Sequence, residues 1–337
     1  MHPDSVRDAE RVPHGGTTDR SVLDLSANTN PETPPGTECI YTAALAEADR
    51  YPDDRYDEFR AAAAGFVGCR PEQVVPTPGG LAAIRLAIQT TVRPGDSVVV
   101  PYPSFGEYAR EVRLQGAEPV FVPHDEMLAT DPTDHAMVIA CTPNNPTGEC
   151  PPRDDLVALA DRCADSGTRL LADEAFLGYT EQASLAGHDG VIVARSLTKL
   201  FGLPGLRAGY AVATGAERDA LDTARRAWNL GTPAAAVGAH CLRQTQFVAS
   251  TRETVARERA RLRDALEPHF DVAPSDAPFL LLDCRDRDVD ALLDRAREAG
   301  VVLRDARTFR TLDSHVRVAV KNRDATDQAL AALGVTH

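Results

Sequence analysis

We predict an α/β protein with a large domain around a mainly parallel central sheet and a smaller α+β domain at its C-terminal end. The chain has 337 residues, enough for one large domain with a satellite or for two ordinary domains. Short β-branched runs alternate with amphipathic helical stretches through its middle, which is typical of parallel strands joined by crossover helices. From about Thr232 this alternation gives way to a long Arg/Glu-rich stretch followed by short strands.

The central sheet is predicted from apolar runs that are too short to form helices. The predicted strands are residues 73–75, 97–101, 118–122, 136–141, 169–172, 190–194 and 207–213. Between them, apolar residues recur every three or four positions, so that one face of each segment can cover the sheet. The predicted helices are residues 81–92, 105–115, 153–166 and 217–226.

The last third of the chain predicts the smaller unit. It contains a helical stretch over residues 232–266, strands at 279–283, 301–304 and 316–320, and helices at 289–300 and 325–333. We expect the N-terminal segment to complete this unit. The predicted division is an N-terminal arm that packs with the small domain (residues 1–30), a large domain around the central sheet (31–228) and a small C-terminal domain (229–337).

Charge and cysteine content limit the possible partners. Asp and Glu outnumber Lys and Arg by 50 to 36, and a formal charge of -14 repels phosphate backbones, so we expect no nucleic-acid partner. The seven cysteines are scattered and form no C-x-x-C pair, which argues against a disulfide framework and a structural zinc site. We therefore expect reduced thiols and no metal.

The compartment is predicted from what the chain lacks. Residues 1–20 are polar, and no run of about 18 apolar residues occurs, so we expect neither a signal peptide nor a membrane span. These features predict a cytoplasmic protein. Its acidity, and its preference for arginine over lysine, also fit a GC-rich or salt-adapted source.

Lysine is rare in this chain, which draws attention to Lys199. Only Lys199 and Lys321 are lysines among the 36 basic residues. Lys199 follows an apolar strand, at the point where an open α/β sheet presents its ligand crevice. Its amine suits a Schiff base with an aldehyde cofactor, and the nearby Ser196, Thr198 and Arg207 suit a phosphate dianion. The alternative is a surface charge at a helix start.

Two further polar residues suit the same cofactor, pyridoxal 5'-phosphate (PLP). Asp173 closes an apolar run and can pair with the pyridine nitrogen; alternatively it caps the next helix. Asn145 can donate to the 3'-oxygen of the ring; taken alone, it belongs to an Asn-Pro turn. Because Asn145, Asp173 and Lys199 each follow a predicted strand, we expect them to converge on one edge of the sheet.

The three motifs together resemble the fold-type I PLP enzymes of the class I/II aminotransferase superfamily, and the similarity covers essentially the whole chain. They are Asn145-Pro146-Thr147-Gly148, Asp173-Glu174-Ala175 and Ser196-x-Thr198-Lys199 with Arg207. The resemblance implies that Lys199 forms the internal aldimine, that Asp173 binds N1 and that Asn145 binds O3'.

The same resemblance assigns the remaining cofactor contacts. It implies that Ser196 and Arg207 hold the phosphate together with the turn Gly79-Gly80-Leu81, whose backbone N–H groups open a helix. It further implies that Phe105 stacks on the ring. Tyr51 resembles a tyrosine that reaches across a dimer to the neighbour's cofactor phosphate, so a homodimer with shared sites is expected.

Within that superfamily, the chain resembles the threonine-phosphate decarboxylase family, which is close to the histidinol-phosphate aminotransferases. The segments that carry this resemblance are His14-Gly15-Gly16, residues 24–31, Cys141-Thr142-Pro143-Asn144-Asn145 and Arg195-Ser196-Leu197-Thr198-Lys199. Phe176 stands where the aminotransferase usually has tyrosine. Thr77-Pro78-Gly79-Gly80 and Lys321 depart from the family wording.

The substrate site is implied by that resemblance as well. Arg304 would hold the substrate phosphate and Arg317 its carboxylate, while His14 and Asn28 would close the pocket from the N-terminal segment. A planar guanidinium suits both anions because it forms two parallel hydrogen bonds. Taken alone, each of these arginines is a surface charge.

The implied reaction is the decarboxylation of O-phospho-L-threonine to (R)-1-amino-2-propanol O-phosphate and CO2 in cobalamin biosynthesis. The outcome depends on which bond at Cα lies perpendicular to the cofactor ring, because that bond breaks. If the Cα–H bond lies perpendicular to the ring, the chain would instead be a histidinol-phosphate aminotransferase or a related class I/II aminotransferase. A third possibility is a protein that binds PLP without catalysis.

Overall fold

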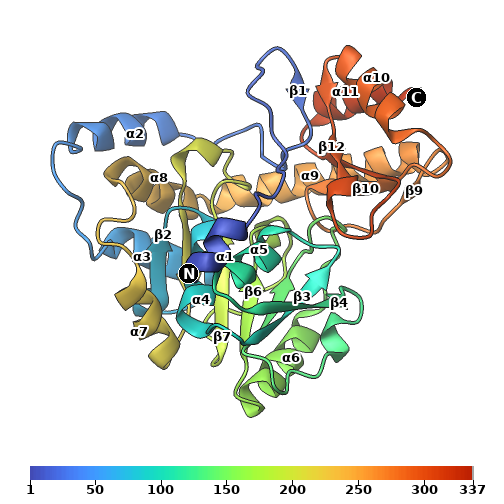
Figure 1. Cartoon of the computed structure of the whole chain (residues 1–337). Coiled ribbons are helices and arrows are strands. Elements are labelled where there is room, and N and C mark those ends of the chain that lie inside the picture. Colours follow the sequence, from blue (N-terminus) through green and yellow to red (C-terminus); the bar gives the residue numbers. More distant parts are fainter. Residues whose placement is uncertain (336–337) are drawn as a thin grey trace.

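The computed structural model describes residues 1–335 and contains two main sheets (Figure 1). The strands of the larger sheet follow the order β2-β8-β7-β6-β5-β3-β4. Their bounds are β2 Val74–Thr77, β3 Ser97–Tyr102, β4 Glu118–Pro123, β5 Met137–Cys141, β6 Arg169–Asp173, β7 Val191–Ser196 and β8 Gly209–Val212. In this sheet β8 runs opposite to the other six strands, so the predicted mainly parallel α/β fold is confirmed.

The strands of this sheet are apolar on both faces. Successive residues alternate between two core clusters, one on each side: Val99, Val138 and Leu170 belong to one cluster, and Val100, Ile139 and Leu171 to the other. Because side chains of a strand point alternately to opposite faces, a strand covered on both faces is a continuous apolar run. This is why the strands were predictable from short runs.

Helices connect and cover these strands. The elements of the first two thirds are α1 Pro3–Asp8, α2 Thr37–Ala46, α3 Asp57–Val67, α4 Gly80–Thr91, α5 Glu107–Leu114, α6 Arg153–Asp165 and α7 Gly215–Ala224. Helices α2 and α3 were not predicted. Strand β2 begins one residue later than predicted, since Gln73 lies in a 3-10 turn, and β8 is shorter because Arg207 adopts a left-handed conformation (φ 52°).

A smaller sheet has the order β12-β13-β10-β9. Its strands are β9 Asp271–Val272, β10 Phe279–Asp283, β12 Arg304–Asp305 and β13 His315–Ala319; the helices in this part of the chain are α8 Thr232–Leu242, α9 Thr245–Leu266, α10 Val289–Glu298 and α11 Arg323–Leu333. In a separate pair, β1 Leu23–Asp24 runs parallel to β11 Val301–Val302. The domain boundaries at residues 30 and 228 stay a prediction. The last two residues of the predicted C-terminal domain, 336 and 337, lie outside the described part of the chain.

The helical stretch predicted over residues 232–266 is confirmed, but it consists of two helices. The stretch is interrupted at Arg243 and Gln244, and the two parts pack in different places. Helix α8 lies beside α2 and α3, whereas α9 runs on toward α11 and the small sheet. Nothing in the local sequence marks this break, because the packing of distant elements determines it. The predicted strand 301–304 is likewise divided between β11 and β12.

The N-terminal segment contacts both halves of the molecule. Helix α1 lies beside α5 (Figure 1), and the backbone N–H of His2 donates to the carbonyl of Leu114 at 2.7 Å. A second contact comes from Arg110 on α5, whose Nε donates to the carbonyl of Glu10 at 2.9 Å. The chain then passes to β1 and the small unit. Residues 1–30 therefore bridge the two sheets.

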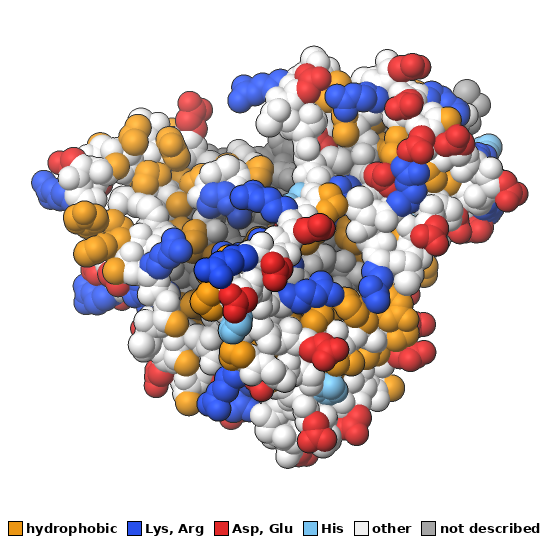
Figure 2. Space-filling view, in the orientation of Figure 1, with side chains coloured by type: hydrophobic (Ala, Val, Ile, Leu, Met, Phe, Trp, Pro, Cys, Tyr) orange, Lys and Arg blue, Asp and Glu red, His pale blue; other side chains and the backbone are white. Residues whose placement is uncertain are grey.

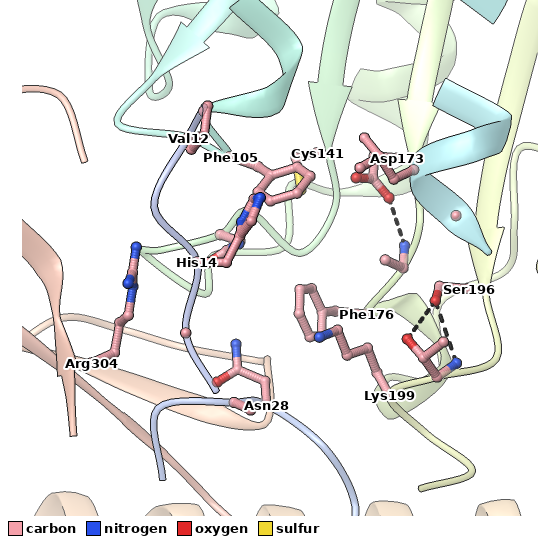
Figure 3. A pocket seen from close by; sticks show the side chains of 18 of the residues that line it. Val12, His14, Asn28, Phe105, Cys141, Asp173, Phe176, Ser196, Lys199 and Arg304 are labelled. Carbon is pink, nitrogen blue, oxygen red and sulfur yellow. Dashed lines mark hydrogen bonds between the residues drawn. The ribbon is translucent and has the colours of Figure 1, made fainter. Parts of the chain in front are cut away.

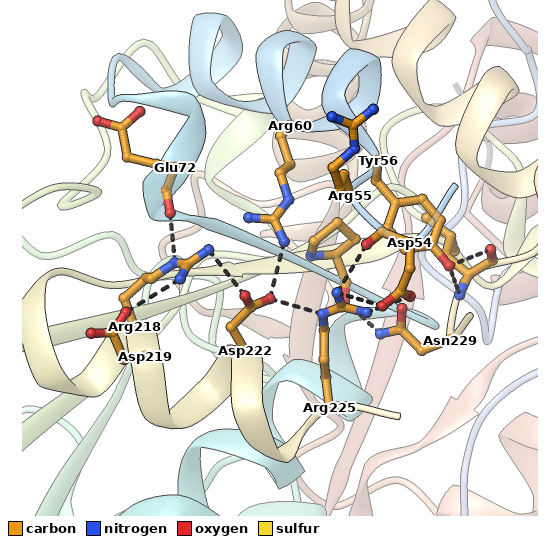
Figure 4. Close-up of polar contacts among 12 residues, drawn as sticks. Asp54, Arg55, Tyr56, Arg60, Glu72, Arg218, Asp219, Asp222, Arg225 and Asn229 are labelled. Carbon is orange, nitrogen blue, oxygen red and sulfur yellow. Dashed lines mark hydrogen bonds and ion pairs between the residues drawn. The ribbon is translucent and has the colours of Figure 1, made fainter. Parts of the chain in front are cut away.

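A network of ion pairs joins the segment before α3 to the segment after α7 (Figure 4). Arg225 contacts Asp54 at 2.7 Å and Asp222 at 2.8 Å, and Asp222 also accepts from Arg60 at 3.0 Å. The hydroxyl of Tyr56 donates to the carbonyl of Leu230 at 2.9 Å. These contacts hold residues 51–56 against residues 225–230. The two segments lie far apart in the sequence, and no local pattern predicts that they meet.

Among residues 1–335, no helix combines the length and the apolar character that a membrane crossing requires. The longest helix, α9, carries several arginines and glutamates along its length.

Candidate active site

A cavity of about 290 Å³ lies at the carboxyl ends of β5, β6 and β7 (Figure 3). Its wall combines residues of the large sheet, the N-terminal segment and the small sheet. Most of the residues singled out in the sequence line it: His14, Asn28, Gly80, Leu81, Phe105, Asn145, Asp173, Ser196, Thr198, Lys199, Arg207, Arg304 and Arg317. The predicted convergence on one sheet edge therefore holds in space, while the role of each residue stays a prediction.

Lys199 lies in the loop that follows β7, and contacts from both directions position this loop. The N–H of Leu197 donates to the carbonyl of Ala208 at 3.1 Å, and the N–H of Asn30 donates to the carbonyl of Lys199 at 3.0 Å. Burial, followed by the positive charges of Arg317 and Arg207, lowers the pKa of the Lys199 amine to about 8. A substantial fraction of the amine is therefore neutral near pH 8 and can act as a nucleophile or accept a proton.

Asp173 ends β6 with its carboxylate buried. The hydroxyl of Tyr108 donates to Oδ2 at 2.5 Å, and the N–H of Ala175 donates to Oδ1 at 3.0 Å. Burial raises the pKa of Asp173, while these two hydrogen bonds oppose that rise by stabilising the ionised form. A cation beside the carboxylate would stabilise the ionised form further, which is what a protonated ring nitrogen provides.

Tyr108 was not predicted as a site residue. It lies on α5, three residues after Phe105, and its ring meets the Phe105 ring edge-on at 5.5 Å between centroids. The spacing of three places both side chains on one side of the helix start. This spacing is the only sequence signal that pointed to Tyr108, and it does not reveal a hydrogen bond to a strand 65 residues away.

Arg317 is a buried cation with incomplete neutralisation. It lies on β13, and its guanidinium donates to Oδ1 of Asn145 and, at 2.9 Å, to the carbonyl of Ser26. Its Nε has no hydrogen-bond partner in residues 1–335, nor has the buried Oδ1 of Asn28. Burial and the nearby charge of Arg304 lower the pKa of Arg317 to about 9. A buried guanidinium without a carboxylate partner favours the binding of an anion.

The turn before α4 forms a cradle with space for a phosphate. Gly79 has φ 94°, and a Cβ at this position would lie 2.7 Å from Nη2 of Arg207. A Cβ added to Gly80, which opens α4, would lie 3.0 Å from that of Ser196. The free N–H groups of a helix start, a guanidinium and the Ser196 hydroxyl are donors that suit a phosphate dianion. The hydroxyl of Ser196 lies 2.8 Å from that of Thr198.

These residues fit pyridoxal phosphate in three independent respects. The amine of Lys199 suits the aldehyde, the carboxylate of Asp173 suits the ring nitrogen, and the cradle around Gly79 suits the phosphate. Gly79 itself does not line the cavity, but it contacts Arg207, which does.

The N-terminal segment covers one side of the cavity. Nε2 of His14 lies 2.9 Å from Oε1 of Glu107, and its ring lies 5.7 Å from that of Phe105. Arg304, opposite, donates to the carbonyl of Pro13 and to the hydroxyl of Thr308, each at 2.8 Å. Figure 3 shows Arg304 at the end of the cavity away from Asp173. Burial lowers the pKa of Arg304.

Tyr51 also lies outside the cavity and, unlike Gly79, it has no interaction with a residue of the cavity wall in the described part of the chain. Its side chain is 78% exposed and stacks on Trp228 at 4.5 Å between centroids. A role for Tyr51 in a cofactor site therefore requires a second copy of the chain.

Comparison with known proteins identifies relatives over nearly the whole chain. Residues 20–333 match the family described as aminotransferase class I and II. The chain is 30% identical to a threonine-phosphate decarboxylase of Salmonella typhimurium, covering 98% of this chain and 95% of that protein. It is 29% identical to a histidinol-phosphate aminotransferase of Archaeoglobus fulgidus, covering 94% and 93% of the two chains.

Solved structures agree on the fold. The histidinol-phosphate aminotransferase of Sinorhizobium meliloti, determined in complex with pyridoxal-5'-phosphate, superposes with a TM-score of 0.82 at 21% identity and covers 98% of this chain and 92% of its own.

The depressed pKa of Lys199 predicts a pH-dependent stability of the cofactor-free protein. Its folded pKa of about 8 lies below the ordinary 10.5, so the unfolded chain binds more protons between these pH values and stability rises with pH in this window. Lys199→Met removes the effect. We expect the free energy of unfolding of the wild type, minus that of the variant, to increase by about 3 kcal/mol from pH 8 to 10.5, as measured by urea unfolding. Parallel pH profiles would contradict this.

The bond from Tyr108 to Asp173 predicts a loss of cofactor affinity in Tyr108→Phe. Without the hydroxyl, the pKa of Asp173 rises further and its ionised form is less available to the ring nitrogen. We expect retention of PLP to weaken by about 10-fold in equilibrium dialysis. Tyr179→Phe is the matched control, because the buried Tyr179 hydroxyl has no hydrogen-bond partner in the described chain. Equal retention in both variants would contradict the expectation.

Proposed function

Because the chain belongs to the class I and II aminotransferase family, a family of PLP enzymes, we propose that it decarboxylates O-phospho-L-threonine. The products are (R)-1-amino-2-propanol O-phosphate and CO2. The reaction would serve cobalamin biosynthesis, and we expect it to occur in the cytoplasm.

The observation that carries this proposal is the pair of guanidiniums in one small cavity. Arg317 is buried beside Asn145, while Arg304 lies toward the N-terminal segment. Their mutual repulsion contributes to the lowered pKa of Arg317, so an anionic ligand between them would be favoured. O-phospho-L-threonine has two anionic ends, a carboxylate for Arg317 and a phosphate for Arg304.

The residues of the cavity divide the chemistry among them. Bound PLP supplies an aldehyde for the substrate amine and a ring that accepts the electrons of the bond broken at Cα. Arg317, with Asn28, would hold the carboxylate so that the bond to Cα faces the ring. Asp173 would keep a positive charge on the ring nitrogen. The Lys199 amine, with a pKa of about 8, is suited to return a proton to Cα after CO2 leaves.

Phe176 supports decarboxylation over transamination. It follows the Asp173-Glu174-Ala175 motif at the cavity wall, and its ring packs edge-on against Phe279 at 5.2 Å. The aminotransferases that the chain resembles usually have tyrosine at the position of Phe176, and a tyrosine hydroxyl can donate to O3' of the cofactor. Phe176 lacks that donor, which leaves Asn145 as the predicted donor to O3'.

Histidinol-phosphate aminotransferase is the alternative function, supported by the relative from Archaeoglobus fulgidus. Arg304 would then hold the phosphate of histidinol phosphate and Arg317 the carboxylate of the amino-group donor or acceptor. This alternative requires a keto acid, whereas decarboxylation does not.

A homodimer is the proposed assembly. Large exposed apolar side chains gather near α2 and the loops beside it: Tyr41, Leu45, Tyr51 and Trp228. Figure 2 shows apolar side chains on this part of the surface, over the region where Figure 1 places α2. A second copy covering this surface would remove it from water. It would also give Tyr51, held in place by the Asp54–Arg225 network, a route to the neighbouring cofactor phosphate.

The decarboxylation proposal predicts release of CO2 from O-phospho-L-threonine without added 2-oxoglutarate. Lys199→Ala should abolish the reaction and Arg317→Gln should lower kcat/KM by about 100-fold or more. Lys321→Ala is the matched control, because Lys321 does not line the cavity. Glutamate formed from histidinol phosphate and 2-oxoglutarate would favour the aminotransferase instead, because the amino group then passes from histidinol phosphate to the keto acid. No turnover of either substrate by PLP-loaded protein would indicate binding without catalysis.

The assembly proposal predicts twice the chain mass in light scattering. Leu45→Asp should shift the protein toward the monomer, because it places a charge in the proposed interface. Val6→Asp, an exposed apolar residue on α1 outside this surface, should leave the dimer intact. A wild-type protein with the mass of one chain would contradict the proposal.

A further inference from the structure

A second hollow adjoins the active-site cavity, outside the N-terminal segment. It is an open groove of about 800 Å³. Residues 5–13 form one wall, and the start of α5 together with Phe121 on β4 forms the other. Figure 1 shows α1 and α5 side by side at this place. None of the predicted site residues except Phe105 belongs to the groove.

The groove is rich in arginine although the whole chain is acidic. Arg11, Arg110, Arg113 and Arg310 line it, against two carboxylates, those of Asp8 and Glu10. Ion pairs to Glu107 at 3.3 Å and Glu111 at 3.4 Å neutralise Arg110. In the described chain, neither Arg113 nor Arg310 forms an ion pair or a side-chain hydrogen bond. Most arginines of this chain are paired with a carboxylate or a carbonyl. Arg11 is unpaired as well, so three of the four arginines in this groove have no such partner among the described residues.

Two of these unpaired arginines, Arg113 and Arg310, lie against the same aromatic ring. The guanidinium carbon of Arg310 lies 4.1 Å from the centroid of the Phe121 ring, and that of Arg113 lies 5.9 Å from the same centroid. Arg310 also lies 6.0 Å from the Tyr102 ring. Contact with a ring face holds a guanidinium in position and leaves its N–H edge free for a ligand. Two cations on one ring repel each other, and an anion shared between them removes that cost.

The groove is continuous with the active-site cavity. Val12, Pro13, Phe105, Gly106, Thr308 and Phe309 line both hollows. Thr308 accepts a hydrogen bond from Arg304, and Arg310 follows two residues later, just after the 3-10 turn at residues 306–308. An anion held in the groove is therefore separated from the predicted phosphate contact, Arg304, by one short turn of chain.

We propose that this groove is a second anion-binding subsite, which takes a phosphate monoester between Arg310 and Arg113. A dianion suits two guanidiniums, which can each donate two parallel hydrogen bonds. If the proposed function is correct, the ligands are the phosphorylated substrate on its way to Arg304 and the phosphorylated product on its way out. The binding itself does not depend on which reaction the cavity performs.

The test is calorimetric titration of the PLP-loaded protein with inorganic phosphate at constant ionic strength. We expect two equivalents to bind to the wild type, one in the cavity and one in the groove. Arg310→Gln and, separately, Arg113→Gln should weaken the groove equivalent by about 10-fold and leave the cavity equivalent. Arg304→Gln should do the reverse. Arg20→Gln, an exposed arginine that lines neither hollow, should keep both equivalents.

Two results would overturn the subsite: a wild type that binds only one phosphate, or a second equivalent that Arg310→Gln and Arg113→Gln leave unchanged. Failure of the decarboxylation proposal gives a different result from failure of the subsite proposal. In that case O-phospho-L-threonine releases no CO2, while the groove equivalent and its loss in Arg310→Gln are still measured.

Discussion

This structure depends on one constraint: the ionisable side chains at one edge of the central sheet are withdrawn from water and must be stabilised there. Asp173 and Arg317 are buried, and Lys199 is partly buried between them and Arg207. A charge loses several kcal/mol of hydration in such a place unless another group stabilises it. The protein supplies part of that stabilisation through Tyr108 on Asp173 and Asn145 on Arg317. The cofactor, and the anionic substrate proposed above, would supply the remainder.

The same constraint explains why the cavity needs nearly the whole chain. Asp173 and Lys199 come from the carboxyl ends of β6 and β7, Arg317 comes from the small sheet, and Asn28 comes from the N-terminal segment. Parallel strands place their ends at one edge but leave that edge open to water. The N-terminal segment and the small sheet close it. They are joined to each other by the bond from Arg317 to the Ser26 carbonyl and by the bond from the N–H of Ala319 to the Leu25 carbonyl. A charge at the sheet edge is therefore desolvated only when both halves are in place.

Charge is distributed unevenly over an acidic chain. Arginines gather where anions are expected: Arg207 at the cradle, Arg304 and Arg317 in the cavity, and Arg113 and Arg310 in the adjoining groove. A local positive field inside a negative molecule attracts small phosphorylated anions while the exterior repels polyanions. This distribution agrees with small-molecule substrates and is independent of whether the cavity releases CO2 or transfers an amino group.

The sequence by itself determined the α/β class, most strands of the central sheet and the convergence of Asn145, Asp173 and Lys199. These features follow from local patterns, since buried strands are apolar on both faces and successive parallel strands end at one edge. Only the tertiary structure decided the break between α8 and α9, the bond from Tyr108 to Asp173 and the exposure of Tyr51 outside the cavity. Each of these depends on which distant segments pack together. The periodicity of a single segment carries no information about its partners. The charged residues at the sheet edge were therefore predictable, while the contacts that stabilise them, from Tyr108 to Asp173 and from Asn145 to Arg317, were not.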